Sequence, residues 1–207
     1  MVVVFEPSTE NPTRRRVIWT AFSGLSAAGA LWWWRNIGSP AAIPASDSGE
    51  EVLIADFSAS GEKLNSTRVR KIVRPKSEWW ARLTPQQYYV LREHSTDTPF
   101  TGTYYRMHEN GLYRCLGCEN ALFDSTSKYD SGTGWPSFSA PIANENLRSV
   151  ELPGLSRKEA LESGIEVLCK RCDGHLGHIF GDGPSPTNLR YCINESALRF
   201  VARASLP

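Results

Sequence analysis

The sequence predicts a mainly β domain with a few short helices at its start and side. Short apolar segments are separated by turn residues at close intervals, which is typical of antiparallel strands. The chain of 207 residues is long enough for one domain and an N-terminal extension, and its apolar content of 41% suffices for an ordinary core. Two C-x-x-C pairs, separated by 50 residues, indicate that distant segments are joined at one site.

Two segments of this domain have the pattern of a capped helix. Residues 84–94 begin with a threonine at the capping position, a proline at the first helical position and a glutamine at the capping-box position. Residues 156–164 begin with a serine that is followed three residues later by a glutamate, and they end at a glycine. Strands are expected in the segments 111–115, 165–169, 189–194 and 197–202.

The domain is expected to span residues 76–207 and to follow a targeting segment and a linker. Residues 1–40 contain the basic stretch TRRRVI and an apolar run, 17–34, without charged residues. This pattern resembles a twin-arginine export signal and predicts a location in the periplasm or cell envelope. A membrane anchor, in contact with the membrane through residues 17–37, and a disordered tail are the alternatives. Residues 41–75 are expected to be a linker because proline, serine, glycine and aspartate are frequent there.

Four of the five cysteines form the two C-x-x-C pairs: Cys115 with Cys118, and Cys169 with Cys172. Two such pairs supply four thiolates at the spacing of a tetrahedral zinc site. Because four sulfurs leave no open coordination position, the predicted Zn²⁺ is structural and not catalytic. Disulfide bonds, a redox-active C-x-x-C pair and iron bound by four thiolates are the alternatives.

The fifth cysteine, Cys192, has no partner in the sequence. If it lies on a strand, Arg190 and Asn194 share its face, because side chains alternate along a strand. An arginine there favours the thiolate, which is the nucleophilic form of cysteine, and an asparagine can orient a neighbouring group. The alternative is a buried structural cysteine.

A second cluster of polar residues follows the last zinc-type pair. His175 and His178 come directly after it and are candidates for proton transfer, and Asp182 could fix a histidine tautomer. Turn histidines and additional metal ligands are the alternatives, although four sulfurs already complete the metal site.

The segment YDSGTGWPSF, residues 129–138, combines turn residues with a tryptophan. Gly132, Gly134 and Pro136 shape the backbone that holds Trp135. Read without its neighbours, Trp135 is a buried core residue.

Taken in order, the segments CLGC, KYDSGTGWPSF, CKRCDGHLGHIFGDGP and RYCINESALRF resemble the methionine-R-sulfoxide reductase family, also called the selenoprotein R or B-type family. The likeness runs from about Leu83 to Phe200. It implies a mainly β fold with two antiparallel sheets, and a zinc ion bound by four cysteines away from the active site. It also implies reduction of the R epimer of methionine sulfoxide, free or in proteins, to methionine.

The resemblance assigns a role to each candidate residue. Cys192 matches the nucleophile, whose thiolate attacks the sulfoxide sulfur and is left as a sulfenic acid. His175 and His178 match the histidines that bind water and supply protons. Asp182 and Arg190 match the residues that hold the charge and hydrogen-bond network around the thiolate, and Asn194 matches the asparagine near the nucleophile. Trp135 matches the tryptophan that packs against the S-methyl group of the substrate, and Phe138 is assigned to substrate binding with it.

Two positions depart from the family pattern. Many members carry at the position of Thr133 a cysteine that resolves the sulfenic acid as a disulfide. This chain is expected to lack a free resolving cysteine, so that a thioredoxin-like protein or a small thiol reduces Cys192 directly. Glu195 replaces a small polar residue and is expected to face away from Cys192, with little direct effect.

Two other classes of function stay open at this point. One is a non-catalytic zinc-ribbon binding module, and the other is a thiol peroxidase or redox sensor that uses Cys192. The net charge of +1 gives no electrostatic case for a nucleic-acid partner. A binding module would also leave Cys192, the two histidines and Trp135 unexplained together.

Overall fold

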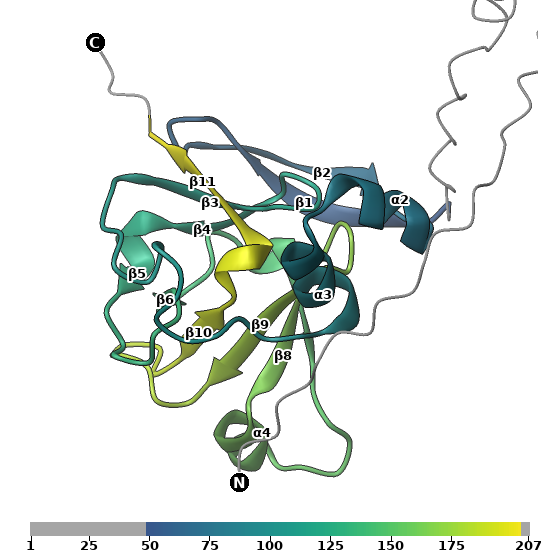
Figure 1. Cartoon of the computed structure of the whole chain (residues 1–207). Coiled ribbons are helices and arrows are strands. Elements are labelled where there is room, and N and C mark those ends of the chain that lie inside the picture. Colours follow the sequence, from purple (N-terminus) through teal and green to yellow (C-terminus); the bar gives the residue numbers. More distant parts are fainter. Residues whose placement is uncertain (1–48, 204–207) are drawn as a thin grey trace, which may run out of the picture. The chain divides into compact units, whose positions relative to one another are not determined.

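The computed structural model describes residues 49–203 and is mainly β (Figure 1). All strand pairs of this part are antiparallel, as predicted, but they form three sheets where two were expected. The largest sheet has the order β5 (Lys128–Tyr129), β6 (Ser137–Phe138), β10 (Arg190–Ile193), β9 (His175–Phe180), β8 (Ile165–Cys169) and β7 (Leu147–Val150). The second has the order β11 (Leu198–Ala202), β3 (Gly111–Cys115) and β4 (Ala121–Asp124).

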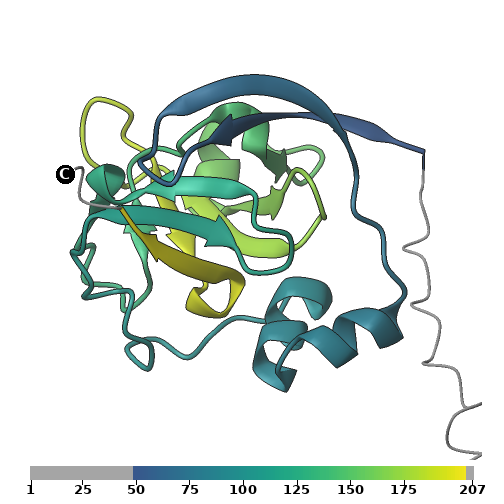
Figure 2. The same cartoon turned by 90° about the horizontal axis from the view of Figure 1, so that it is seen from above.

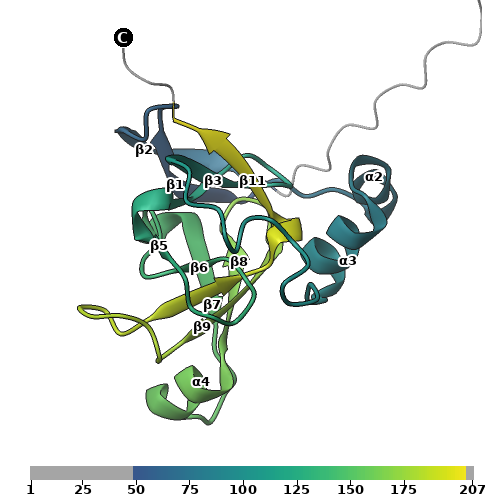
Figure 3. The same ribbon diagram turned by 60° about the vertical axis from the view of Figure 1, so that its left-hand side comes forward.

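The two predicted helices are confirmed, with the predicted caps. Helix α3 (Pro85–Glu93) starts with a reciprocal capping box between Thr84 and Gln87, and α4 (Arg157–Ser163) starts with the same arrangement. Helix α2 (Lys76–Arg82) was not predicted, because no capping side chain marks its start after Pro75. Figure 3 shows α2 and α3 beside the sheets and α4 at the far end of β8.

The expectation of a linker over residues 41–75 is wrong for most of the described part of that range. Strands β1 (Glu51–Phe57) and β2 (Lys63–Arg70) form a hairpin that arches over one side of the domain (Figure 2). The buried Asn146 side chain fastens it, because Asn146 accepts a hydrogen bond from the Ala55 amide and donates one to the Ala55 carbonyl. Composition concealed the hairpin, since nearly every residue of β2 is exposed and polar.

The register of the six-stranded sheet separates a core face from a face that carries polar and reactive groups. Cys192 is directly opposite Ser137 on β6 and His178 on β9, and His178 is opposite Glu166 on β8. Side chains at paired positions point to the same face, so these groups lie together. The residues between them point to the other face and are buried in the core: Phe138, Ile165, Val167, Ile179, Tyr191 and Ile193.

A β-bulge brings His175 to the face that carries His178. In a regular strand, residues three apart point to opposite faces, but Val167 pairs with Gly177 and Leu168 with His175, so β9 carries one extra residue. Gly177 has a φ of 152°, and a Cβ there would lie 2.1 Å from the Cys192 carbonyl oxygen. Glycine is therefore required where β9 bends against β10.

The predicted export signal or anchor lies outside the described residues, as does the proposed membrane contact through residues 17–37. Between residues 49 and 203, no helix has the length and hydropathy needed to cross a bilayer.

Candidate functional site

The four cysteines of the two C-x-x-C pairs converge on one buried site between the sheets. The Sγ atoms of Cys115 and Cys172 are 3.7 Å apart, those of Cys118 and Cys169 are 3.5 Å apart, and all four lie within 4.8 Å of one another. A tetrahedron with metal–sulfur bonds of about 2.3 Å has edges of about 3.8 Å. The four residues therefore fit a tetrahedral metal ion, and the site joins the end of β3 to the end of β8.

The chemistry of this site also favours a cation. Hydrogen bonds with the three other thiols and burial raise the pKa of Cys115 well above its ordinary value. Burial would also raise the pKa of Cys169, but hydrogen bonds from its three thiol neighbours hold it well below the ordinary value, so one thiolate is stabilised and further thiolates are costly. A bound divalent cation offsets that cost, because a coordinating thiol is deprotonated outright. Four buried sulfurs leave no position for a substrate, as expected of a structural site.

Cys192 lies at a separate cavity of about 130 Å³. The cavity combines an aromatic part, formed by Trp135 and Phe180, with a polar part at the thiol and His178. The remaining lining residues are Thr96, Gly177 and Asn194. Cys192 is partly accessible, so a small group that enters the cavity can reach the sulfur.

Opposing effects act on ionisation of the Cys192 thiol. Burial raises its pKa, whereas the Arg190 guanidinium and the Thr133 hydroxyl favour the thiolate and oppose that rise. Arg190 is held by two hydrogen bonds of 2.9 Å to Asp182, and its guanidinium carbon lies 4.5 Å from the centre of the Phe180 ring. A cation is thus fixed two residues from the thiol on the same face of the sheet.

Among the described residues, Asp182 is hydrogen-bonded to Arg190 and to no histidine, so the expectation that it fixes a histidine tautomer is wrong. Its contact with Arg190 fits its other expected role, in the hydrogen-bond network around the thiol. The hydrogen bond from Arg190 lowers the pKa of the Asp182 carboxyl and keeps it ionised. A carboxylate that does contact a histidine belongs to Glu166, which no sequence motif had indicated.

The two histidines occupy different depths. His178 lines the cavity beside Cys192, whereas His175 is 1% exposed and does not line it. The ring centres are 5.4 Å apart, and burial lowers the pKa of both histidines. His175 Nδ1 lies 2.7 Å from Glu166 Oε1, and the same oxygen lies 2.5 Å from His94 Nδ1. These three residues form the second group, among those described, whose ligand atoms could hold a metal ion.

Asn194 lies just beyond strand β10 and orients its neighbours, as expected. Its Oδ1 accepts a hydrogen bond from the Asp97 amide at 2.9 Å, and its Nδ2 donates to the Leu176 carbonyl at 3.1 Å. The side chain is buried. It therefore ties the segment after α3 to β9 at the edge of the cavity.

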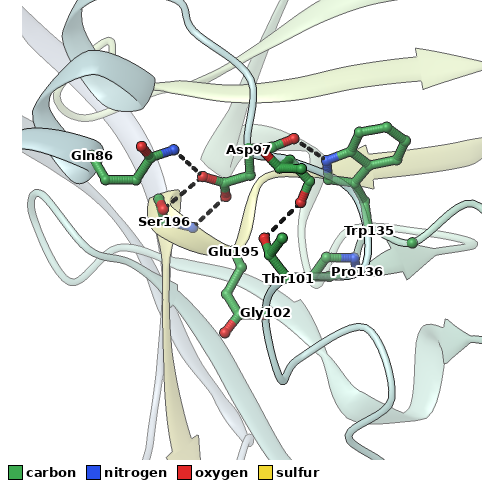
Figure 4. Close-up of a pocket in the computed structure, with 10 residues that line it drawn as sticks. Gln86, Asp97, Thr101, Gly102, Trp135, Pro136, Glu195 and Ser196 are labelled. Atoms are coloured by element: carbon green, nitrogen blue, oxygen red, sulfur yellow. Dashed lines mark hydrogen bonds between the residues drawn. The ribbon is translucent and has the colours of Figure 1, made fainter. Parts of the chain in front are cut away.

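The Trp135 ring is held at its indole nitrogen (Figure 4). Its Nε1 donates to the Asp97 carbonyl at 2.9 Å, and the Asp97 carboxylate is held in turn by Gln86 and Ser196. Gly134 has a φ of 90°, and a Cβ there would lie 2.8 Å from the Phe100 amide nitrogen. The glycine thus permits the close turn that presents the ring, in agreement with the sequence analysis.

Thr133 lies next to the reactive thiol. Its hydroxyl oxygen is 2.9 Å from that of Ser131, which lies 2.7 Å from the hydroxyl oxygen of Ser137, and the Thr133 hydroxyl also favours ionisation of Cys192. Glu195 is turned away from this region, as expected: its carboxylate accepts hydrogen bonds from the amides of Thr103 and Tyr104.

The expectation of a substrate contact from Phe138 disagrees with its position. Phe138 is fully buried, and its ring stacks on Phe123 with centres 4.3 Å apart. The register explains the difference, because Ser137 pairs with Cys192, and the next residue must point into the core. The second aromatic wall of the cavity is Phe180, which alternation from His178 would have indicated.

Comparisons with known proteins show the family of the chain. The SelR domain matches residues 83–202, more than half of the chain. A peptide methionine sulfoxide reductase MsrB of Bradyrhizobium diazoefficiens is 48% identical over 132 residues, which are 62% of this chain and 89% of that protein. The mitochondrial methionine-R-sulfoxide reductase B2 of Rattus norvegicus is 45% identical over 133 residues, 63% of this chain and 76% of that protein. The chain therefore belongs to the methionine-R-sulfoxide reductase family, and residues 83–202 form its SelR domain.

Proposed function

We propose that the protein reduces methionine-R-sulfoxide, free and within proteins, to methionine, with Cys192 as the nucleophile. The observation that carries the proposal is the cavity of about 130 Å³ in which the Cys192 thiol, His178 and the Trp135 ring meet. The thiolate attacks the sulfoxide sulfur, the sulfoxide oxygen passes to Cys192 as a sulfenic acid, and methionine leaves with the electron pair. Protons for the oxygen come from the histidine side of the cavity.

The shape of the cavity supports a sulfoxide substrate with a small substituent. Trp135 and Phe180 offer an apolar surface to the S-methyl group, and polar groups lie on the other side at Cys192 and His178. A sulfoxide sulfur is tetrahedral, so an apolar wall and a proton donor at fixed positions admit only one epimer with its sulfur toward the thiol. The cavity therefore favours one epimer, and we expect it to be the R epimer because the chain belongs to the methionine-R-sulfoxide reductase family.

We propose that the sulfenic acid is reduced without a second cysteine of this chain. The other four cysteines are buried together in the cluster that fits a structural Zn²⁺, and threonine occupies position 133. A thioredoxin-like protein or a small thiol would form a mixed disulfide with Cys192 and release water. A second thiol would then restore the Cys192 thiol and leave with the first as a disulfide. Mass spectrometry after one turnover without reductant is expected to find sulfenic acid and no intramolecular disulfide at Cys192.

Turnover of separate R and S epimers of a blocked methionine sulfoxide, with dithiothreitol as reductant, tests the function. The full chain is expected to consume the R epimer alone, and Cys192→Ser is expected to be inactive with unchanged zinc content. An inactive wild-type protein that is folded and contains zinc would favour the binding-module alternative. Faster oxidation of Cys192 by hydrogen peroxide than by the sulfoxide would favour a peroxidase or redox sensor.

We also propose that the protein is exported to the periplasm or cell envelope. The support is the basic stretch TRRRVI and the uncharged run that follows it in residues 17–34. Residues 1–48 fused to a reporter protein are expected to direct it out of the cytoplasm, and an Arg14→Lys, Arg15→Lys variant is expected to reduce that export.

A further inference from the structure

We infer that Glu166, assisted by His94, is a positioning residue that holds His175 in one tautomer, with the proton on Nδ1 and with Nε2 as the nitrogen that exchanges protons with the site. The inference rests on the proposed function and extends it by two residues. Neither Glu166 nor His94 lines the cavity at Cys192. Their effect is exerted through His175.

One carboxylate oxygen contacts both histidine rings. Glu166 Oε1 lies 2.7 Å from His175 Nδ1 and 2.5 Å from His94 Nδ1. A carboxylate can only accept, so Nδ1 of each histidine donates. Because His175 is 1% exposed, its ring has no solvent partner at Nδ1 that could replace Glu166. The hydrogen bond therefore fixes both the orientation and the tautomer of the ring.

The other nitrogen of His175 is left for proton exchange. Nε2 is buried and has no hydrogen-bond partner among the described residues. Buried polar atoms without a partner are rare, and they occur where a water or a reacting group binds. The His175 ring is 5.4 Å from the His178 ring, which lines the cavity at Cys192. A water bound at Nε2 would connect His175 to this wall of the cavity.

The charged state of Glu166 is suited to this role. Burial by itself would raise the pKa of Glu166, but the hydrogen bonds from His94 and His175 outweigh burial and hold the pKa below its ordinary value. The titratable groups that act on His175 are Glu166, His178 and His94. Among the described groups that act on His175, the ionised Glu166 is the only anion, and it can therefore stabilise the His175 ring when the histidine has taken up a proton.

His94 keeps the carboxylate in place from the solvent side. It is the left-handed C-cap of α3, with a φ of 57°, and its side chain is about half exposed.

A metal ion bound by His94, Glu166 and His175 would be a different explanation of the cluster. The observed distances of 2.5 and 2.7 Å fit hydrogen bonds, because zinc bonds of about 2.0 Å would separate neighbouring ligand atoms by about 3.3 Å.

The tautomer can be measured directly on the wild-type, zinc-loaded full chain. The sequence contains four histidines, so ¹⁵N-labelled histidine gives four ring spin systems, which single His→Gln variants assign. Long-range ¹H–¹⁵N spectra are expected to show His175 with its proton on Nδ1. A His175 ring protonated on Nε2 alone would overturn the inference, and so would a second equivalent of zinc that is lost in His94→Ala.

Kinetics then test whether this arrangement matters for turnover. Glu166→Gln is expected to lower kcat for the R epimer by about 10- to 100-fold, with KM nearly unchanged, because the amide can donate to Nδ1 and reverse the tautomer. Glu166→Asp should restore part of kcat, and His94→Asn should have a smaller effect than Glu166→Gln. Glu162→Gln, at an exposed position of α4, is the matched control and should behave as wild type.

The outcomes separate this inference from the proposed function. Wild-type protein without activity on the R epimer would contradict the proposed function, while the spectra would still report the tautomer. Active wild-type protein together with Glu166→Gln within twofold of its kcat would overturn the role of Glu166. Zinc content and thermal unfolding of each variant show whether the substitution has disrupted the structure. If it has, the NMR spectra of the wild-type protein, which report the His175 tautomer, test the inference instead.

Discussion

The four-cysteine cluster and the cavity at Cys192 differ in how the chain brings their residues together. The cluster takes four identical side chains from two tight turns, and each turn carries both members of a pair three residues apart. The cavity takes one or two side chains from each of several segments, and the register between β10 and β9 places Cys192 opposite His178. A site made by local spacing can be read from the sequence, whereas a site made by register requires knowledge of which strands are neighbours.

Loss of one cysteine of the four-cysteine cluster is expected to have the largest effect, because it affects the whole domain. Cys169→Ser should abolish zinc binding and remove most of the stability of the domain, since metal binding free energy is folding free energy, of order 10 kcal/mol at such sites. Zinc content and thermal unfolding measure the result. Cys192→Ser is the control and should keep both zinc and stability. A stable, zinc-free Cys169→Ser protein would show that the cluster is not structural.

Changes at the cavity should spare the fold and reduce activity. Arg190→Met keeps an apolar chain against Phe180 but removes the positive charge near Cys192. We expect kcat/KM to fall by about 10- to 100-fold, since less thiolate is present at neutral pH. Zinc content should be unchanged. Activity within twofold of wild type would show that Arg190 does not support the thiolate.

The pH dependence of alkylation sharpens the same point. Burial raises the pKa of Cys192 and Arg190 opposes that rise, so the rate of reaction with iodoacetamide should increase with pH through a midpoint above the ordinary value for a thiol. Arg190→Met should move this midpoint to still higher pH, because only the opposing effect is removed. Zinc-loaded protein is used so that the other four cysteines stay protected. An unchanged midpoint would contradict the assignment.

The smallest effect is expected from removing the hydrogen bond that holds the Trp135 ring. Trp135→Phe keeps a ring but removes the hydrogen bond from Nε1 to the Asp97 carbonyl. A hydrogen bond of this kind contributes about 0.5–1.5 kcal/mol, so kcat/KM for the R epimer should fall by about three- to tenfold. Discrimination against the S epimer should fall as well, and the two epimers measured side by side report it. Full retention of selectivity would show that the tether does not orient the ring.

The same difference between local spacing and strand register explains which features could be predicted from the sequence. The two capped helices and each of the two C-x-x-C pairs rest on residues within a few positions of each other, and the match between the two pairs indicated that they meet. The misassignments concern longer distances. Phe138 was placed at the substrate, although the pairing of Ser137 with Cys192 sends it into the core, and Asp182 was expected to serve a histidine. Glu166 was overlooked because only the bulge in β9 brings His175 within its reach.

The exposed polar strand β2 illustrates a further limit. Its composition resembles a linker, yet β1 is anchored by the buried Asn146 and by packing of Ala55 and Phe57 on Leu112 and Ala121. Amino-acid composition reflects the average exposure of a segment to solvent. When only one strand of a hairpin is buried, the average polarity of the hairpin is similar to that of a loop. The feature that could have indicated a strand is the pattern within β1, where buried and exposed residues nearly alternate.

The threonine beside Cys192 has a consequence for how the protein serves a cell. If no second cysteine of the chain reacts with the oxidised thiol, each reduction of a methionine sulfoxide leaves the protein inactive until an external thiol reduces Cys192. Capacity for repair is then set by the supply of reducing equivalents and not by the number of protein molecules. Under sustained oxidant load, a chain of this design would stall at its oxidised stage, open to irreversible overoxidation of its single working thiol. On this proposal, threonine at position 133 leaves the sulfenic acid open to further oxidation until a donor arrives, whereas a cysteine there would trap it as a disulfide.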